Sequence, residues 1–205
     1  MWICKSWNEY KILDVSGGDK LEDWNGVRVV RPDPQVIWNE KSHPALWNTA
    51  DGVYHRSRSG GGSWQFTRKL PERWPLAFEP LGLTFYIKPT GFKHMGLFPE
   101  QAANWEWMYN LIAREMRPIR VLNLFAYTGG ATLAAAAAGA QVTHIDSSKG
   151  VVGWAKENLA LSGLSDRPVR LIAEDAIKFV EREIRRGNVY DGIIMDPPSY
   201  GRGPS

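Results

Sequence analysis

Asp196 is a carboxylate with unusual neighbours, because it follows an apolar run and precedes two prolines, Pro197 and Pro198. Proline lacks an amide hydrogen and stiffens the backbone. The stretch therefore presents a carboxylate and carbonyl oxygens to a ligand, with few donors competing for them. Such a group accepts hydrogen bonds from a substrate amine or ring N–H and orients its lone pair. The alternative interpretation is a strand that simply ends at prolines.

Two further carboxylates stand at the ends of apolar segments, Asp146 after "QVTHI" and Asp175 after "RLIAE". A carboxylate at the end of the second strand of a nucleotide-binding fold can accept both ribose hydroxyls. Asp175 could accept from an adenine amine, and Ala176 after it would leave room for the ring. The alternative for Asp146 is an acid that favours a helix N-terminus through the helix dipole.

A glycine turn in "NLFAYTGG" connects another apolar strand, which contains Asn123, to a helix opened by Thr128 and Gly129. Amides at a helix N-terminus can hold a ligand carboxylate. Phe125 and Tyr127 stand where a dinucleotide fold needs glycines for its pyrophosphate. The turn therefore predicts a nucleoside site without a diphosphate, unless it is only a tight strand-to-helix turn.

Alternating strands and helices must position these groups. From residue 119 apolar strands "IRVLNLF", "QVTHID", "PVRLIAED" and "YDGIIMD" alternate with helices "TGGATLAAAAAGA", "SSKGVVGWAKENLALSG" and "AIKFVEREIRRG". Ile177, Val180 and Ile184 share one face of the last helix. This order predicts an α/β fold with a doubly wound parallel sheet. Since ligands bind at the carboxyl ends of such strands, the candidate residues should converge there.

The first 80 residues read differently, as short strands punctuated by turns such as "SGGD" and "RPDP". Most of the ten tryptophans fall there and are expected to pack a small β-rich core. "HRSRSGGGS" combines arginine with glycine and could approach phosphate, although a hairpin loop is the preferred interpretation. A strand over 83–87 and a helix over 101–116 follow.

The composition excludes several classes of protein. The 205 residues include 25 basic and 22 acidic side chains, a mild excess that permits nucleic acid as a partner without requiring it. One cysteine rules out an internal disulfide and suits a cytoplasmic location. The four histidines lack the spacing of metal ligands, so no metal is expected. No apolar run approaches the roughly 20 residues that span a bilayer, and no membrane association is expected.

Taken together, the motifs resemble those of class I S-adenosylmethionine-dependent methyltransferases, with a Rossmann-like sheet. "VLNLFAYTGGATLAAAAAGA", "HIDSSKGVVGWAKENL", "AEDAIKFV" and "IIMDPPSY" follow the order of the family motifs. "GFKHMGLFPEQ" ahead of them resembles the branch with large-subunit ribosomal RNA methyltransferases. The resemblance covers about residues 80 to 200.

The resemblance implies S-adenosyl-L-methionine as cofactor and RNA, ribosomal RNA first, as substrate. It implies that Asp196, Pro197, Pro198 and Tyr200 face the substrate. The implied cofactor-binding residues are Phe98, Gln101, Asn123, Phe125, Ala126, Tyr127, Thr128, Gly129, Asp146, Asp175 and Ala176, with Lys93 a weaker candidate.

The sequence departs from the family pattern in two places. Ser199 stands where amine methyltransferases of nucleic acids place an aromatic residue to stack on the base, which weakens an exocyclic amine as the target and leaves a ring nitrogen open. Methylation at C5 of a pyrimidine needs a nucleophilic cysteine, and Cys4 is far from every motif.

The expected organisation is a β-rich domain over 1–80 and a methyltransferase domain over 81–205. Only the first four strands of the family's sheet are present, so we expect the chain to be the front part of a longer protein. Three alternatives remain open: a methyltransferase for a protein or small molecule, a nucleotide-dependent oxidoreductase, and a non-catalytic RNA-binding or assembly factor.

Overall fold

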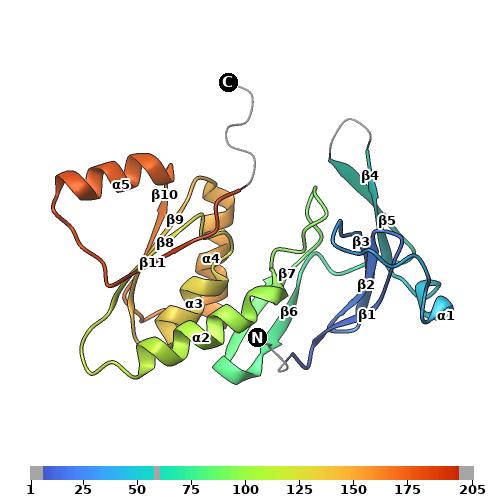
Figure 1. Ribbon diagram of the computed structural model, residues 1–205, viewed down its shortest axis with the longest axis horizontal. Helices are drawn as coiled ribbons and strands as arrows, with labels where there is room; N and C mark the ends of the chain where they lie inside the picture. The colour runs from blue at the N-terminus through green and yellow to red at the C-terminus, as the bar shows by residue number, and fades with distance from the viewer. Residues whose placement is uncertain (1–6, 58–60, 199–205) are drawn as a thin grey trace. The chain divides into compact units, whose positions relative to one another are not determined.

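The protein divides into two compact units (Figure 1). The computed structural model describes residues 7–57 and 61–198. The N-terminal unit ends at Pro99, and the α/β unit begins at Glu100. The division comes later in the chain than the boundary after residue 80 that the sequence predicts. In the described residues no helix is long and apolar enough to cross a membrane.

The N-terminal unit is built from two small sheets. Five strands lie in chain order, and they pair antiparallel except for the parallel pair of β3 and β4. They are β1 (Tyr10–Ser16), β2 (Asp19–Trp24), β3 (Val27–Pro32), β4 (Gly52–Arg56) and β5 (Gly62–Phe66), with the short helix α1 (Pro44–Trp47) before β4. An antiparallel hairpin of β6 (Trp74–Phe78) and β7 (Leu83–Ile87) follows, joined by the 3-10 turn η1 (Glu79–Leu81).

A buried carboxylate organises the core of the five-stranded sheet. Glu22 accepts hydrogen bonds from Nε and Nη2 of Arg31 at 2.6 and 2.8 Å and from the hydroxyl of Tyr10 at 2.7 Å. Burial raises the pKa of Glu22, but the Arg31 pair outweighs it and the net shift is downward. The guanidinium also lies 5.2 Å from the ring centre of Trp24, which is fully buried. Trp24 therefore has the packing role expected of these tryptophans, whereas Trp38 is exposed.

The α/β unit carries a four-stranded, all-parallel sheet in the order β10-β9-β8-β11. After the 3-10 turn η2 (Pro99–Gln101), its elements are α2 (Ala102–Ala113), β8 (Arg120–Leu124), α3 (Gly130–Ala137), β9 (Gln141–Asp146), α4 (Lys149–Leu161), β10 (Val169–Ala173), α5 (Ala176–Arg185) and β11 (Gly192–Met195). Helix α5 covers one face of the sheet, and α3 and α4 cover the other (Figure 1). The predicted doubly wound sheet, preceded by a β-rich region, is confirmed.

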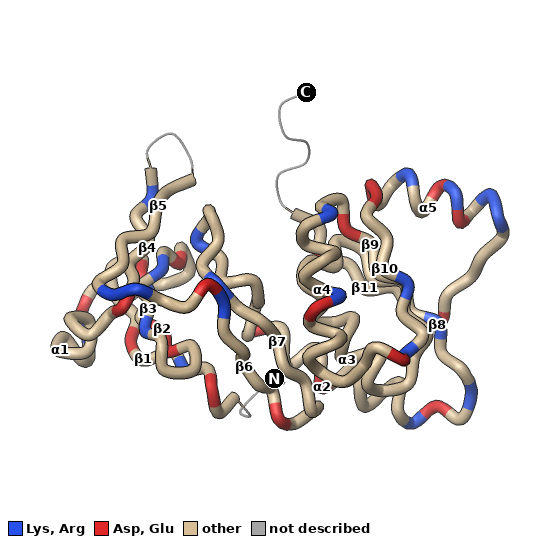
Figure 2. The backbone as a smooth tube through the Cα atoms, turned by 180° about the vertical axis from the view of Figure 1, so that it is seen from behind, with Lys and Arg blue, Asp and Glu red and all other residues tan. Residues whose placement is uncertain are grey.

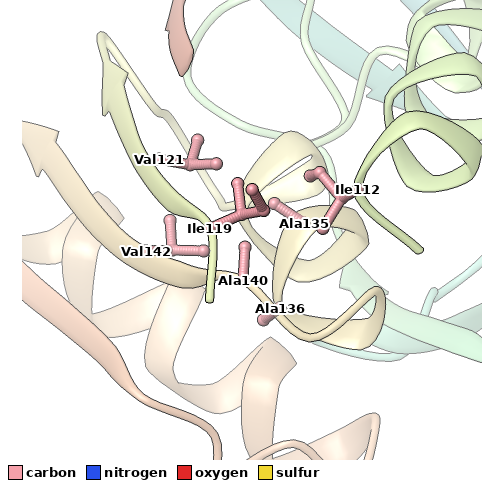
Figure 3. Close-up of a cluster of buried hydrophobic side chains, with 7 residues drawn as sticks. All are labelled: Ile112, Ile119, Val121, Ala135, Ala136, Ala140 and Val142. Carbon is pink, nitrogen blue, oxygen red and sulfur yellow. The ribbon is translucent and has the colours of Figure 1, made fainter. Parts of the chain in front are cut away.

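The face covered by α3 has a core of small and β-branched side chains (Figure 3). Val121 and Val142 on the sheet contact Ala135 and Ala136 of α3, and Ile112 reaches the same cluster from α2. Alanines let the helix backbone approach the strands closely, which explains the alanine run in the sequence. On the opposite face Leu122, Leu124 and Ile145 pack against Phe179 of α5.

Helix α5 packs only in part through the apolar stripe read in the sequence, because Val180 alone of that stripe contacts the core. Ile177 and Ile184 are exposed, while Phe179 is fully buried and Glu183 nearly so. Glu183 accepts hydrogen bonds from the Tyr190 hydroxyl at 2.6 Å and from Nδ2 of Asn188 at 2.8 Å. These bonds, the one from Tyr190 above all, lower the pKa of Glu183 and satisfy its carboxylate on the sheet side.

A chain of buried polar side chains joins α3 to the two central strands. Asn123 of β8 donates through Nδ2 to the Thr132 hydroxyl at 2.9 Å, and that hydroxyl lies 2.9 Å from Nδ1 of His144 on β9. Asn123 and His144 are register partners. Burial lowers the pKa of His144 to about 4, against the opposing effect of the Asp146 charge, so the ring stays neutral at physiological pH.

His144 should make folding stability depend on pH. From pH 6.5 down to about 4 the unfolded chain binds a proton that the folded state excludes, so the free energy of unfolding should fall by about 3 kcal/mol through this group. Urea unfolding of wild type and His144→Gln at pH 7.5 and 5 measures the effect. The free energy of unfolding of the variant should change less between the two pH values than that of wild type. An equal change in the two proteins would contradict the assignment.

Substituting alanine for two helical glycines should change the stability of the fold in opposite directions. A Cβ on Gly130 would come 2.5 Å from Cζ2 of the buried Trp105, whereas one on Gly153 would meet nothing within 4 Å. Gly130→Ala should lower the free energy of unfolding by about 1–3 kcal/mol through overpacking. Gly153→Ala should raise it by about 1 kcal/mol through helix propensity. Denaturant unfolding of both variants checks the sign of each change.

Candidate functional site

The strand ends of the α/β unit lie level along one edge of the sheet. Met195, Leu124 and Ile145 are register partners on β11, β8 and β9. The next residues in each chain segment are Asp196, Phe125 and Asp146. Adjacent strands are about 4.8 Å apart, so Asp146 and Asp196 flank the start of the β8–α3 turn with their backbones roughly 10 Å apart. The predicted convergence of these three segments is therefore present.

The β8–α3 turn has an uncommon backbone. Phe125 and Tyr127 have φ values of +55° and +50°, and Gly129 has +95°. Ala126 and Thr128 between them are not in the positive region. Bulky residues rarely adopt positive φ, so neighbouring contacts must hold the turn in place. Such conformations concentrate at functional sites.

Hydrogen bonds from β9 and α4 hold this turn. The N–H of Ala126 donates to the carbonyl of Ile145 at 3.0 Å, and the N–H of Tyr127 donates to Oδ2 of Asp146 at 3.0 Å. On the other side, Nδ2 of the fully buried Asn158 donates to the carbonyl of Thr128 at 2.9 Å. The turn is therefore fixed from both flanks.

Gly129 meets a second requirement besides its positive φ. A Cβ there would lie 3.0 Å from Cδ1 of Leu133 and 3.2 Å from Cβ of Ala155 on α4. The absence of a side chain lets the start of α3 sit against α4.

Asp146 has a structural role as well as a free acceptor capacity. Oδ2 accepts from Tyr127 N–H, and Oδ1 accepts from Ser148 N–H at 3.0 Å. Ser148 in turn caps α4, so the helix-terminus interpretation holds in part. A carboxylate has about four lone-pair positions, so each oxygen retains capacity for one more donor such as a ribose hydroxyl.

Asp175 and Ala176 begin α5 one strand farther along the same edge. Oδ1 of the exposed Asp175 accepts from the N–H of Lys178 at 3.0 Å and caps the helix. Ala176 is buried in the cluster with Phe179. Its side chain therefore faces the sheet, while its amide belongs to the first helical turn, where N–H groups have no intrahelical acceptor.

The remaining predicted residues fall in four different settings. Asp196, Pro197 and Pro198 follow β11 and are exposed, and Tyr200 and Ser199 lie outside the described residues. Gln101 precedes α2, and its Oε1 accepts from Nδ2 of Asn104 at 2.7 Å. Asn123 is buried in the polar chain beneath the turn. Phe98 and Lys93 belong to the N-terminal unit, where Phe98 contacts the ring of His94 and Lys93 donates to the Pro32 carbonyl.

Two buried polar residues near the site were not identified from the sequence: Asn158, which donates to the turn, and His144, which contacts Thr132 of α3. Asn158 follows Ala155 by three positions and precedes Leu159, so it lies on the buried stripe of α4. A polar residue on such a stripe is a detectable signal, since buried amides need partners.

The hydrogen bonds made by the backbone amides of the turn suit a nucleoside ligand better than a dinucleotide. A pyrophosphate needs free backbone amides at this position. Here the amides of Ala126, Tyr127 and Gly129 already donate to Ile145, Asp146 and Ala126. Asp146 keeps acceptor capacity beside the turn. The residues present therefore suit a cofactor with a ribose and no diphosphate.

Comparison with known proteins agrees with this geometry. Residues 45–205 match the S-adenosylmethionine-dependent methyltransferase family. A ribosomal RNA large subunit methyltransferase K/L from Shewanella sp. (strain MR-4) is 35% identical over 136 residues, which is 65% of this chain and 18% of that protein. The chain thus spans about a fifth of the length of the curated relatives it matches.

Solved structures show the same fold. The S-adenosylmethionine-dependent methyltransferase from Agrobacterium tumefaciens superposes with a TM-score of 0.91 at 46% identity, over 98% of this chain and 63% of that one. SMU.776, described as a methyltransferase complexed with SAH, superposes with a TM-score of 0.73 at 20% identity, over 97% and 54% of the two chains. The cofactor is S-adenosylmethionine, and the chain belongs to the S-adenosylmethionine-dependent methyltransferase family.

Proposed function

We propose that this protein transfers a methyl group from S-adenosylmethionine to RNA, with ribosomal RNA as the favoured substrate. The observation that carries the proposal is the level row of strand ends, which brings the β8–α3 turn between Asp146 and Asp196. The curated relatives named as ribosomal RNA methyltransferases support the choice of substrate.

In this proposal the edge of the sheet divides into a cofactor side and a substrate side. Asp146 accepts hydrogen bonds from the ribose hydroxyls, and the turn from Phe125 to Gly129 surrounds the methionine part. Asp175 and the amide of Ala176 bind the adenine, since one is an acceptor and the other a donor, as an aminopurine edge requires. Gln101 and Asn123 remain assigned to the surroundings of the cofactor, and the role of Phe98 stays a prediction from the resemblance.

The substrate side is formed by the segment after β11. The cofactor supplies an activated methyl group, so the protein's main task is to align the substrate nucleophile. The exposed carboxylate of Asp196 orients an N–H of the base and accepts its proton, while Pro197 and Pro198 hold the backbone rigid. Tyr200 keeps its proposed role at the base.

The substrate class is tested with radiolabelled S-adenosylmethionine. The protein is incubated with deproteinised ribosomal RNA, with ribosomal proteins and with a small-molecule extract. Label in RNA supports the proposal. Label only in protein or small molecules would favour the alternative methyltransferase, and RNA binding without affinity for S-adenosylhomocysteine would favour a non-catalytic factor.

Asp196→Ala should separate binding from transfer. The exposed carboxylate is assigned to the substrate, so its loss should leave the affinity for S-adenosylhomocysteine within about twofold while methyl transfer falls by about 100-fold or more. Calorimetry and the labelling assay measure the two quantities. Asp166→Ala, at another exposed carboxylate of the α/β unit, is the matched control. An equal loss of affinity and transfer in Asp196→Ala would show that its role is misplaced.

Asp146→Asn should weaken the binding of the cofactor. The change removes the charge that binds the ribose and the turn, and charge-assisted hydrogen bonds of this kind correspond to about 10- to 100-fold in affinity. Titration with S-adenosylhomocysteine measures the loss, with Asp166→Asn as control. Unchanged affinity in a folded variant would sink the ribose assignment.

A further inference from the structure

The sheet face that α5 covers carries polar side chains at its amino end. Both faces of a doubly wound parallel sheet are normally apolar. On this face the carboxyl half follows the rule, with Leu122, Leu124 and Ile145 packed under Phe179. The alternation of strand side chains places Arg120, Gln141 and Thr143 on the same face nearer the amino end, where the rule would require apolar residues.

The register brings arginines of two strands to this place. Arg120 on β8 is the partner of Gln141 on β9, and Thr143 on β9 is the partner of Arg170 on β10. Arg120 and Arg170 thus share a face with one strand between them and are offset by two residues along it, so their Cα atoms are roughly 12 Å apart. In Figure 2 basic positions, in blue, mark this part of the unit near the labels of β8 and β10.

A cavity of about 320 Å³ lies at this position. Its polar lining includes Arg120, Arg167, Arg170, Gln141, Thr143 and Tyr190. The volume reaches the lower limit for pockets that hold small ligands, about 300 Å³. The pocket lies at the amino ends of the strands, so it is separate from the site at their carboxyl ends.

The guanidinium groups of this cavity are not neutralised by ion pairs with the described residues. Among residues 7–57 and 61–198, Arg120, Arg167 and Arg170 form no ion pair. The nearby acid Asp191 is engaged by Nη1 of Arg117 at 2.6 Å and by the backbone N–H of Arg120 at 2.8 Å. The Arg120 guanidinium instead lies 5.2 Å from the ring centre of Tyr190.

Glu183, the other acid near the cavity, also has its hydrogen-bond donors outside the arginines of the cavity. Glu183 accepts from Tyr190, Asn188 and Arg186. Three guanidinium groups, none of them paired with a carboxylate among the described residues, lie beside the side-chain amide of Gln141 and make a site for a multiply charged oxyanion. Guanidinium presents paired N–H groups that match phosphate geometry.

We propose that this cavity, hereafter the arginine cavity, is a phosphate-binding site. Its ligand is a phosphodiester of bound RNA or a free phosphorylated compound, and the two sources share the same recognition chemistry. In the RNA case the inference rests on the proposed function, and the site anchors the RNA backbone away from the methylated base. Phosphate contacts position a nucleic acid without reading its sequence.

The test compares the double variant Arg120→Gln/Arg170→Gln with Arg114→Gln/Lys156→Gln in the full chain. The control pair removes the same charge from exposed positions on α4 and at the end of α2, away from the cavity. Both variants are first checked for cooperative unfolding and for S-adenosylhomocysteine affinity, which neither should change. A misfolded double variant is replaced by Arg170→Gln alone, at an exposed position.

The probes are a fluorescein-labelled single-stranded RNA and inorganic pyrophosphate. If RNA is the source, the double variant should bind the RNA about tenfold more weakly than the control. Its plot of log affinity against log salt should be shallower by about 1.4, as expected for two lost phosphate contacts. If a free compound is the source, RNA affinity should match the control, while thermal stabilisation by pyrophosphate is lost only in the double variant.

Equal RNA affinity and equal pyrophosphate stabilisation in the double variant and the control would overturn the arginine cavity as a phosphate site. A wild-type protein that binds neither probe would overturn it as well. The proposed function fails separately, by absence of methyl transfer to RNA in a protein that still binds phosphate through these arginines.

Discussion

The hydrogen bond between the amide of Tyr127 and the carboxylate of Asp146 is the contact on which the candidate site depends. It joins the turn after β8 to the end of β9 and compensates a backbone that is unfavourable for two aromatic residues. The same carboxylate also accepts from Ser148 and thereby positions the start of α4. One side chain therefore sets the geometry of the turn, the strand end and the following helix.

This contact explains why the turn needs no glycine at Phe125 or Tyr127. A glycine-rich turn leaves its amides free for phosphate groups, whereas this turn uses several of its amides internally. The conformation is thus set before a ligand arrives. Preorganised sites of this kind avoid the entropy of ordering a loop on binding.

Much of the fold could be predicted from the sequence, because its signals are local. Short apolar runs such as "RVLNL" predict buried strands, and Gly139 and Gly163, both with positive φ, end the helices they follow. The order of strands and helices then fixes a parallel sheet and brings Asp146 and Asp196 to one edge. The positions of these two carboxylates needed no knowledge of distant contacts.

The rest depended on contacts that sequence periodicity does not contain. Helix α5 offers an isoleucine stripe, but it packs through Phe179 and Glu183, because Tyr190 and Asn188 from the following loop satisfy the carboxylate. Asn158 was missed for a similar reason, since its partner Thr128 lies thirty residues earlier. A polar residue can be buried in the core only when a partner satisfies its hydrogen bonds. Here those partners are distant in the chain, and a periodic pattern cannot identify them.

The close approach between Gly129 and Ala155 has a consequence for how this site can vary. A Cβ on Gly129 would lie 3.2 Å from Cβ of Ala155, so a larger residue at position 129 requires α4 to shift by a few tenths of an ångström. The turn is bonded to α4 through Asn158, and such a shift would be transmitted to the backbone that surrounds the ligand. The spacing between α3 and α4 therefore affects the geometry of the site through the Asn158–Thr128 hydrogen bond.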